Sequence, residues 1–316
     1  RIDAWIDPPA YTGRAPVVLL AEGRRVLAAG EPGEVLSVPQ GSRLLVRSAA
    51  AAGDRPPRPL ILTVTPKGGT ARDIAPTPLP EGTPATTPVE RVATLGADGT
   101  VRLVRDGTTL ADWRITVQPD LPPTIRLVGA PEPQASGALK FSHETADDWG
   151  VVAAEARFQP VEAPRGRPLY SPPSFPLSLP LGRGHIGPAT TIRDVTAHPH
   201  AGATMRMTLV ARDEAGQEGV SESVEVRLPE RPFRKPLARS LAELRRRLAL
   251  DAGEASTVVT ALDALTLAPE RFDTSPAAHL GLRFALRRAA EARDDAALRE
   301  VVDLLWAAAK IGRAHV

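Results

Sequence analysis

Proline is the sequence feature that most limits the folds open to this chain, because it occurs 33 times in 316 residues. That share is roughly twice the usual value of about 5%. Proline lacks a backbone N–H and fixes φ, so it is found in loops, at strand edges and in first helical turns. The composition therefore predicts a protein of short strands and many connections, and it argues against a continuous helical bundle.

The first part of the chain, residues 1–118, is predicted to be a β-sandwich domain. Short apolar clusters recur there, and several alternate with polar residues as half-buried strands do. Turn signals at 30–33, 40–42 and 97–100 separate the clusters, and strands at this spacing are typical of a sandwich or barrel. A Pro-, Thr- and Gly-rich stretch at 66–88 predicts a long exposed loop. The clusters lie at 17–20, 35–38, 44–46, 60–64, 101–104 and 113–117.

A Pro-rich segment at 119–123 predicts a stiff, extended linker, because proline disfavours helix in itself and in the residue before it. A second set of apolar clusters follows, and we expect residues 124–230 to form an immunoglobulin-like β-sandwich domain. The proline-rich loop at 159–188 is expected to connect two strands at one end of this sandwich. The clusters lie at 124–128, 138–141, 151–158, 205–210 and 220–226.

Beyond residue 230 the apolar period changes from that of strands to that of helices, and residues 231–310 are predicted to form a helical segment. Ser275 followed by Pro276 predicts an N-cap and a first helical residue. With short connections the helices are expected to pack as an antiparallel array, which this chain leaves incomplete. The apolar positions that mark the helices are Leu237, Leu241, Leu244, Leu248, Val258, Val259, Leu262, Leu265, Leu298, Val301, Leu305 and Trp306.

Both ends of the chain are interpreted as cut. The chain begins at Arg1 without Met, directly before the strand-like segment 2–6. The last six residues, 311–316, match the in-frame translation of a common sequencing adapter, and we interpret them as an assembly artefact. No stretch approaches the roughly 18 apolar residues of a membrane span, and no signal peptide is visible. With a cut N-terminus, neither observation describes the intact protein.

The charge pattern gives no sign of a nucleic-acid partner. The net charge is +2 although the sequence pI is about 9.3, and the basic residues are nearly all arginine. An Arg-, Ala- and Pro-rich composition is typical of a GC-rich genome, and no groove-binding or single-strand-binding motif accompanies it. Aromatic residues, at 4%, are too sparse for a base-stacking platform. The chain has no cysteine, which removes disulfides, thiolate nucleophiles and Cys-type zinc sites from consideration.

The sharpest local motif is the run Asp147-Asp148-Trp149-Gly150-Val151. Paired carboxylates are compatible with half of an acid/base site or a Ca²⁺ site. The same residues also predict a turn, in which Asp caps the backbone, Gly supplies a positive φ and a strand follows. We favour the turn, because the alternating ligand pattern of a calcium loop is missing. The run 211–216, which contains Asp213 and Gly216, repeats this pattern after a strand.

The loop histidines His198 and His200, with His185 nearby, raise the possibility of a metal site. A zinc site needs three or four convergent ligands, and Asp194 is the only close carboxylate in the sequence. We therefore expect exposed loop histidines and predict no metal, no cofactor and no catalytic residues. A Gly-x-Ser-x-Gly elbow, a phosphate loop and a dinucleotide fingerprint are also missing from the sequence.

The junction between the second β domain and the helices is basic, with Arg231, Arg234, Lys235, Arg239 and 245–247. Such a cluster suits anionic lipid headgroups or an acidic partner. The alternative, which we favour, is a solvated helix face with Glu243 as a local partner.

Three stretches together resemble one uncharacterised family of Gram-negative bacterial inner-membrane proteins, a domain of unknown function. They are DAWIDPPAYTG at 3–13, DDWGV at 147–151, and RPFRKPLA at 231–238 continuing to LDAL at 262–265. The resemblance covers nearly the whole chain up to Trp306. It implies transmembrane helices before this region, a periplasmic location for it, and a long helical portion after it. The family has no known catalytic residues to carry over.

These observations favour a non-enzymatic part of a membrane-anchored envelope protein that acts as a structural or protein-interaction module, with other envelope proteins as partners. A module that binds cell-wall glycan is the alternative. Glycan sites usually present exposed aromatic rings, whereas Trp5, Tyr11, Trp113 and Trp149 are more simply explained as core residues. A hydrolase, resting only on Asp147, Asp148 and the loop histidines, is the weakest hypothesis.

Overall fold

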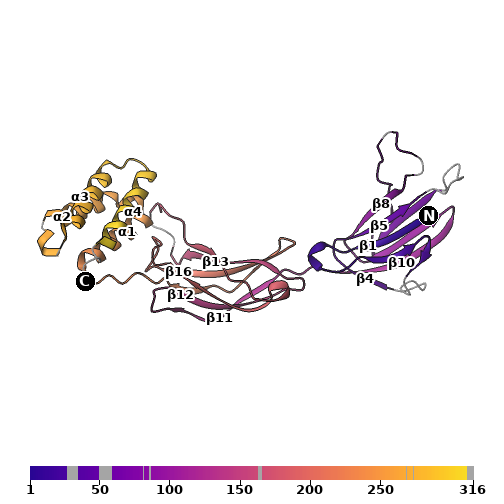
Figure 1. Ribbon diagram of the computed structural model, residues 1–316, viewed down its shortest axis with the longest axis horizontal. Coiled ribbons are helices and arrows are strands. Elements are labelled where there is room, and N and C mark those ends of the chain that lie inside the picture. Colours follow the sequence, from indigo (N-terminus) through magenta and orange to yellow (C-terminus); the bar gives the residue numbers. More distant parts are fainter. Residues whose placement is uncertain are drawn as a thin grey trace. The chain divides into compact units, whose positions relative to one another are not determined.

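The computed structural model describes residues 1–26, 35–49, 59–80, 82–84, 87–162, 166–267, 269–272 and 274–311. The chain is mainly β, with four sheets among these residues and a helical segment at the C-terminal end (Figure 1). It divides into two compact units, Arg1–Leu121 and Pro122–Val316. The division falls within the Pro-rich segment 119–123, which contains no helix or strand.

The first unit contains two sheets that share one core. Their strand orders are β3-β2-β1-β5-β8 and β4-β10-β9-β6-β7. Ile6 and Leu44 from the first sheet join Leu62 and Leu103 from the second in a single buried cluster. The strands are β1 (Ile2–Asp7), β2 (Val17–Ala21), β3 (Arg24–Arg25), β4 (Val35–Pro39), β5 (Ser42–Ser48), β6 (Leu60–Pro66), β7 (Arg72–Asp73), β8 (Val89–Leu95), β9 (Gly99–Arg105) and β10 (Thr108–Gln118).

Each apolar cluster predicted in this unit is part of a strand. Three strands of this unit were not predicted, namely the two-residue strand β3, β7 and β8. The described residues of the stretch 66–88 are mostly exposed, as predicted, but they also include β7, which pairs antiparallel with β6. The strand β8 had no prediction of its own, because its first four residues are only half-buried and include a Glu-Arg pair. The predicted turn at 30–33 lies outside the described residues.

The second unit begins with two further sheets. One has the order β11-β12-β15, and in the other β14-β13-β16-β17 is extended by β18, which also pairs with β16. Phe141 of β12 shares a buried cluster with Met205 and Leu209 of β16. The strands are β11 (Thr124–Pro133), β12 (Leu139–Ala146), β13 (Val151–Pro160), β14 (Ser174–Pro176), β15 (Gly187–Arg193), β16 (Thr204–Asp213), β17 (Glu218–Val220) and β18 (Val224–Arg227).

Two predictions for these strands were wrong. The strand expected at 220–226 is split into β17 and β18, because the hydroxyl oxygen of Ser221 accepts the amide hydrogen of Leu209 at 2.9 Å and interrupts the ladder. The stretch 159–188 was expected to be a loop without strands. It contains β14, which pairs antiparallel with β13.

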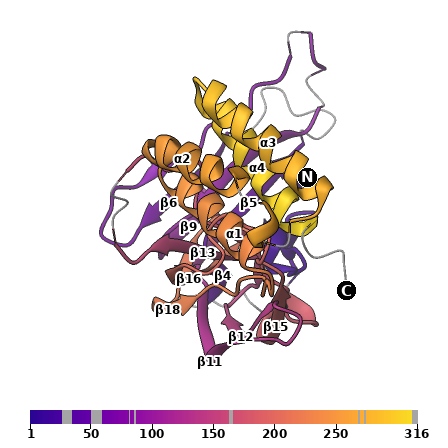
Figure 2. The ribbon, with the colours of Figure 1, turned by 90° about the vertical axis from the view of Figure 1, so that its left-hand side faces the viewer.

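The helical segment comprises α1 (Pro236–Leu250), α2 (Ala255–Leu267), α3 (Pro276–Glu291) and α4 (Asp295–Ile311). The four helices gather side by side in both views (Figures 1 and 2). The predicted stripe on α1 is buried, and Ser275 caps α3 by accepting the amide hydrogen of Ala278. Residues 312–316, most of the stretch interpreted as an adapter, lie outside the described residues. None of the described helices is both long and apolar enough to cross a membrane.

Candidate functional site

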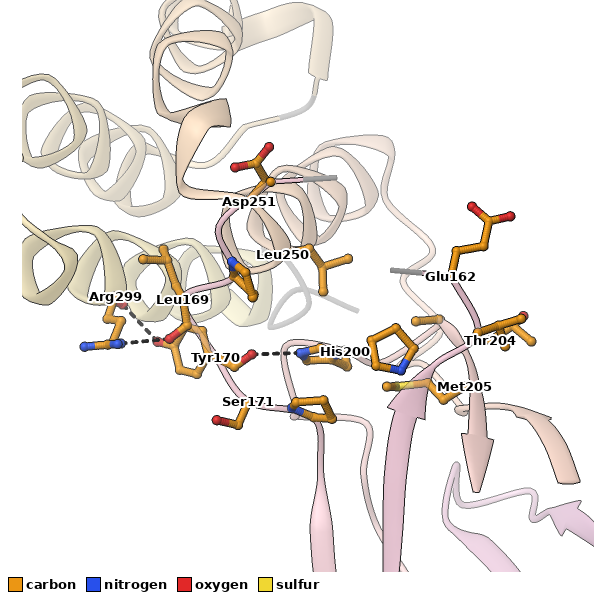
Figure 3. A pocket seen from close by; sticks show the side chains of 16 residues that line it. Glu162, Leu169, Tyr170, Ser171, His200, Thr204, Met205, Leu250, Asp251 and Arg299 are labelled. Carbon is orange, nitrogen blue, oxygen red and sulfur yellow. Dashed lines mark hydrogen bonds between the residues drawn. The ribbon is translucent and has the colours of Figure 1, made fainter. Parts of the chain in front are cut away.

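A cleft of about 820 Å³ lies within the second unit, where the second pair of sheets meets the helices. The end of β13, the start of β16, the loop 166–172, the end of α1 and one residue of α4 form its walls (Figure 3). It is lined by Pro160, Val161, Glu162, Gly166, Pro168, Leu169, Tyr170, Ser171, Pro172, His200, Ala203, Thr204, Met205, Leu250, Asp251 and Arg299. We refer to this set as the cleft.

The loop 166–172 is anchored to the helices by a buried side chain and by backbone hydrogen bonds. Leu169 is 3% exposed and belongs to the helical core. Its amide donates to the carbonyl of Ala249 at 2.9 Å, and the amide of Ala252 donates to the carbonyl of Arg167 at 2.8 Å. A Pro-rich loop with few amide donors of its own is therefore fixed by the end of α1.

Side chains complete the anchoring of this wall (Figure 3). Arg299 Nε donates to the carbonyl of Leu169 at 2.9 Å, and the hydroxyl of Tyr170 donates to the carbonyl of Arg299 at 3.3 Å. His200 Nε2 lies 3.1 Å from the carbonyl oxygen of Tyr170. Because a carbonyl only accepts, Nε2 carries the proton. Burial lowers the pKa of His200, which is 2% exposed.

The cleft combines an apolar interior with charged side chains at its edge. Val161, Ala203, Leu250 and the prolines give it an apolar interior, while the carboxylates of Glu162 and Asp251 point away from that interior (Figure 3). His200 is committed to a backbone carbonyl through the nitrogen that bears its proton. It is therefore not placed to activate a hydroxyl through that nitrogen.

The run at 147–151 forms the predicted turn. Asp147 Oδ2 accepts the amide hydrogens of Trp149, at 2.9 Å, and Gly150. Gly150 has φ +119°, and β13 begins at the next residue. Burial raises the pKa of Asp147, and the neighbouring carboxylates of Asp148 and Asp213 raise it further.

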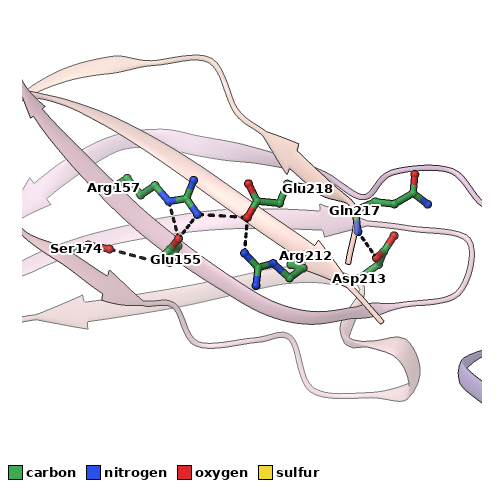
Figure 4. A network of polar contacts seen from close by, with 7 residues as sticks. All are labelled: Glu155, Arg157, Ser174, Arg212, Asp213, Gln217 and Glu218. Atoms are coloured by element: carbon green, nitrogen blue, oxygen red, sulfur yellow. Dashed lines mark hydrogen bonds and ion pairs between the residues drawn. The ribbon is translucent and has the colours of Figure 1, made fainter. Parts of the chain in front are cut away.

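The second predicted turn, at 211–216, has the same construction. Asp213 Oδ1 accepts the amide hydrogen of Gln217 at 2.8 Å, and Gly216 has φ +86°. Beside it, a chain of ion pairs crosses β13, β16 and β17 (Figure 4). Hydrogen bonds from Arg212 and Arg157 lower the pKa of Glu218. Because these side chains are exposed, the pairs contribute little to stability. The network contains Glu155, Arg157, Arg212 and Glu218.

The expectation of exposed loop histidines was wrong for two of the three. His200 is buried and His198 is half-buried, because the loop folds between β16 and the helices; the two rings lie 5.3 Å apart. Burial, with His200 and Arg245 nearby, lowers the pKa of His198 to about 4. His185 Nδ1 instead lies 3.0 Å from the carbonyl oxygen of Pro180. Over the part of the chain that the structure describes, no three histidine or acidic side chains form a metal-binding group.

The arginines of the basic junction include some that form ion pairs on the surface of α1 and one that is buried. Glu243 pairs with Arg246 and Arg247, as the interpretation of a solvated helix face requires. Arg245 contradicts that interpretation, since it is 6% exposed and its guanidinium carbon lies 4.4 Å from the centroid of the Trp306 ring. The sequence carried a weak signal of this burial, because Arg245 stands directly beside Leu244 in the apolar stripe of α1.

The aromatic side chains considered for glycan binding differ in their surroundings. Trp113 is 3% exposed and belongs to the core of the first unit, as expected. Trp5 is only half-buried, with the guanidinium carbon of Arg47 5.5 Å from its ring centroid. The hydroxyl of Tyr11 donates to Asp120 at 3.3 Å. Trp149 is half-buried in its turn.

Comparison with known families gives one match. A sequence model of the family described as "Domain of unknown function (DUF4175)" matches residues 1–311. A search of the curated proteins finds no match.

Three of the solved structures that match this chain are distant from it in sequence. A marsupial T cell receptor is 12% identical, with a TM-score of 0.30 over 64% of this chain and 73% of that one. Astrotactin-2, a vertebrate-specific perforin-like membrane protein, is 13% identical, with a TM-score of 0.27 over 63% and 40%. The purple acid phosphatase PPD1 of yellow lupin seeds is 10% identical, with a TM-score of 0.24 over 65% and 41%. This chain thus spans about two fifths of the length of the last two proteins. TM-scores as low as these carry no argument about function.

Proposed function

The chain belongs to the DUF4175 family of domains of unknown function, and from that premise we propose that it is the non-enzymatic, periplasmic part of an envelope protein anchored in the inner membrane. In this proposal it acts as a protein-interaction module. The cleft binds a segment of a partner polypeptide that carries apolar side chains. The partner is another envelope protein.

One observation carries the proposal: an apolar cleft with a wall that is already fixed in place. A volume of about 820 Å³ lies within the usual range for ligand sites. The wall formed by 166–172 is held by hydrogen bonds from Arg299, Tyr170 and His200. A preformed wall loses little conformational entropy on binding, which favours affinity.

The charges at the edge of the cleft favour a polypeptide over other envelope molecules. Glu162 and Asp251 place carboxylates there, and Arg299 adds a cation. A polypeptide segment supplies apolar side chains for the interior and charges of both signs for the edge. A phospholipid headgroup would be repelled by the two carboxylates. A glycan would find one aromatic ring, Tyr170, whose hydroxyl is already bonded to a backbone carbonyl.

The proposed location rests on the family resemblance. The three stretches at 3–13, 147–151 and 231–265 resemble Gram-negative inner-membrane proteins and lie within the matched residues. In the proposal, the anchor belongs to a part of the protein outside this chain. Cysteine labelling tests the location, because the chain has no cysteine of its own. A single Val220→Cys, at a position 61% exposed and outside the cleft, should react in the full-length protein with a membrane-impermeant maleimide in spheroplasts; labelling only after lysis would contradict the periplasmic location.

We further propose that both sheet pairs are immunoglobulin-like sandwiches. In the second unit, β11-β12-β15 faces β13, β14, β16 and the two short strands β17 and β18 around one core. This is the strand grouping of an A-B-E sheet against a C′-C-F-G sheet. In the first unit, the last strand β10 pairs in parallel with the early strand β4. An experimental structure should show the paired sheets crossing at about 30°; an orthogonal crossing would contradict the assignment.

Photo-cross-linking in living cells tests the cleft. The photo-reactive residue benzoylphenylalanine is placed at Thr204, an exposed position of the cleft. The matched control is Val220, which is 61% exposed on β17 of the same unit. We expect a discrete adduct at Thr204 only, identified by mass spectrometry as an envelope protein. The same pattern at both positions, or no adduct at either, would contradict the proposal.

A further inference from the structure

A second cavity, separate in chemistry from the cleft, lies beside Trp306 in the second unit. Its volume is about 430 Å³. The loop 196–201, the segment 230–233 before α1, residues 239–246 of α1 and Trp306 of α4 contribute to it. We refer to it as the basic pocket. The residues that matter for its chemistry are Glu230, Arg231, Arg239, Glu243, Arg245 and Trp306.

Cations surround the indole ring of Trp306. The guanidinium carbons of Arg245 and Arg231 lie 4.4 Å and 5.6 Å from the ring centroid, and Lys310 Nζ lies at 6.0 Å. Phe233 packs edge-on against the same ring, with centroids 5.7 Å apart. The face of the Trp306 ring therefore attracts positive groups that would otherwise repel one another.

The carboxylates of the basic pocket are already engaged with other arginines. Glu243 pairs with Arg246 and Arg247, and Glu230 pairs with Arg227 and Arg246. Within the described ranges, no carboxylate lies within ion-pair distance of the three remaining arginines, Arg231, Arg239 and Arg245. Asp194 and Asp303 are near enough to interact with Arg231 and Arg245 through space, without reaching that distance. The pocket thus holds an excess of positive charge.

The excess of positive charge is most unfavourable at Arg245, because this side chain is buried. It is 6% exposed, and its Nη2 donates to the carbonyl of Ala197 at 2.6 Å. Its Nε has no hydrogen-bond partner among the described residues. A buried cation held by one carbonyl and one ring face is poorly compensated, because burial removes the hydration of the charge. An anion in the adjoining cavity would supply the missing compensation.

We propose that the basic pocket is a binding site for a phosphate group, with Arg231, Arg239 and Arg245 as its ligands. Guanidinium groups form forked, charge-assisted hydrogen bonds that match the oxygen geometry of phosphate. Three of them suit a dianion better than a single carboxylate. The cavity also leaves room for part of the molecule that bears the phosphate. The phosphate comes either from a free phosphate ester or from a phospholipid headgroup, and this inference does not rest on the cleft or its partner.

Isothermal titration with inorganic phosphate at low ionic strength tests the site. The variant Arg231→Gln/Arg239→Gln removes two ligands whose side chains are not buried, so the fold should persist. Arg283→Gln is the control, since it removes one exposed charge of the same unit outside the pocket. We expect wild-type binding, a loss of at least tenfold in affinity for the double variant, and a change below twofold for the control. No phosphate binding by the wild type, or equal losses in both variants, would overturn the proposal.

Vesicle flotation identifies the source of the phosphate. Vesicles of phosphatidylcholine with phosphatidic acid, whose phosphate monoester can become a dianion, are compared with vesicles of phosphatidylcholine and an uncharged glycolipid. Binding to the anionic vesicles that is lost in the double variant and retained in Arg283→Gln supports a headgroup ligand. Phosphate titration without vesicle binding supports a free phosphate ester. Vesicle binding that both variants retain, together with no phosphate titration, contradicts the site.

Discussion

The guanidinium carbon of Arg245 on α1 lies 4.4 Å from the centroid of the Trp306 ring on α4. This contact joins the first and last helices of the segment next to the β16 side of the unit. The same guanidinium group donates to the carbonyl of Ala197, in the loop that precedes β16. One buried cation therefore connects two helices and a loop of the second sheet pair.

Removal of the Trp306 ring should destabilise the second unit. Trp306→Ala loses the cation–π contact with Arg245 and the edge contact with Phe233, and leaves the buried charge with less compensation. We expect a loss of about 2 to 4 kcal/mol in the free energy of unfolding, measured by urea denaturation. Trp306→Phe keeps a ring and should lose less than half as much. Equal losses in the two variants would mean that the ring face does not stabilise Arg245.

Gly150 should not tolerate a side chain. A Cβ there would lie 2.7 Å from the backbone of Gly184, and φ is +119°. Gly216→Ala is the matched control, because Gly216 also has a positive φ, +86°, but has open space around it. We expect Gly150→Ala to lower the free energy of unfolding by about 2 kcal/mol more than Gly216→Ala does. Thermal or urea unfolding of the two variants measures the difference, and similar losses would contradict the close approach.

His198 should make the protein sensitive to acid. Its pKa is lowered from 6.5 to about 4 in the folded state, so the unfolded chain binds the proton first as pH falls. Stability is therefore lost as pH falls from about 6.5 to about 4, by on the order of 1 to 3 kcal/mol.

The variant His198→Asn isolates this contribution. Asn keeps an acceptor in place of Nδ1, which accepts the amide hydrogen of His200 at 3.2 Å, and it does not titrate. Urea unfolding across this pH range should show a smaller acid loss for the variant. An unchanged pH profile would rule out His198 as the cause.

The carboxylate of Asp147 should oppose folding at neutral pH. Its pKa is raised by burial and by Asp148 and Asp213, so the folded state keeps its proton to higher pH than the unfolded chain. The contribution of this group to stability therefore falls as pH rises from the unfolded pKa through the folded one. Asp147→Asn keeps an oxygen for the amides of Trp149 and Gly150 and removes the charge.

We expect Asp147→Asn to be at least as stable as the wild type at neutral pH, with an advantage that shrinks at acidic pH. Urea midpoints at the two pH values measure this. The control is Asp148→Asn, at an exposed position, which should change stability by less than about 0.5 kcal/mol. A clear loss of stability in the Asp147 variant at neutral pH would show that the charge itself holds the turn.

Strands and helices with a strong apolar period could be predicted from the sequence. The stripe on α1 and the alternation in β9 and β10 both follow the core. The strand β15 could not be found this way, because its one buried residue is Thr191 while its large apolar residue, Ile192, is exposed. A strand whose position depends on pairing with β12 leaves no apolar pattern of its own.

The two cavities were beyond local sequence reasoning for a different reason. The cleft exists because Leu169, in a Pro-rich loop, inserts into the helical core about seventy residues further along the chain. The basic pocket exists because Arg245 meets Trp306 across two helices. Composition indicated the basic junction, but which arginine is buried depends on the tertiary packing.

The central claim is that the cleft binds a partner polypeptide through its apolar interior. The most direct test is to measure the cross-linking yield at Thr204 in variants of Leu250. Leu250 lines the cleft and is only half-buried, so Leu250→Glu and its control Leu250→Met should both fold, as circular dichroism checks. We predict that the adduct at Thr204 is retained with Leu250→Met and falls at least fivefold with Leu250→Glu. An adduct of equal yield in both variants would contradict binding through the cleft.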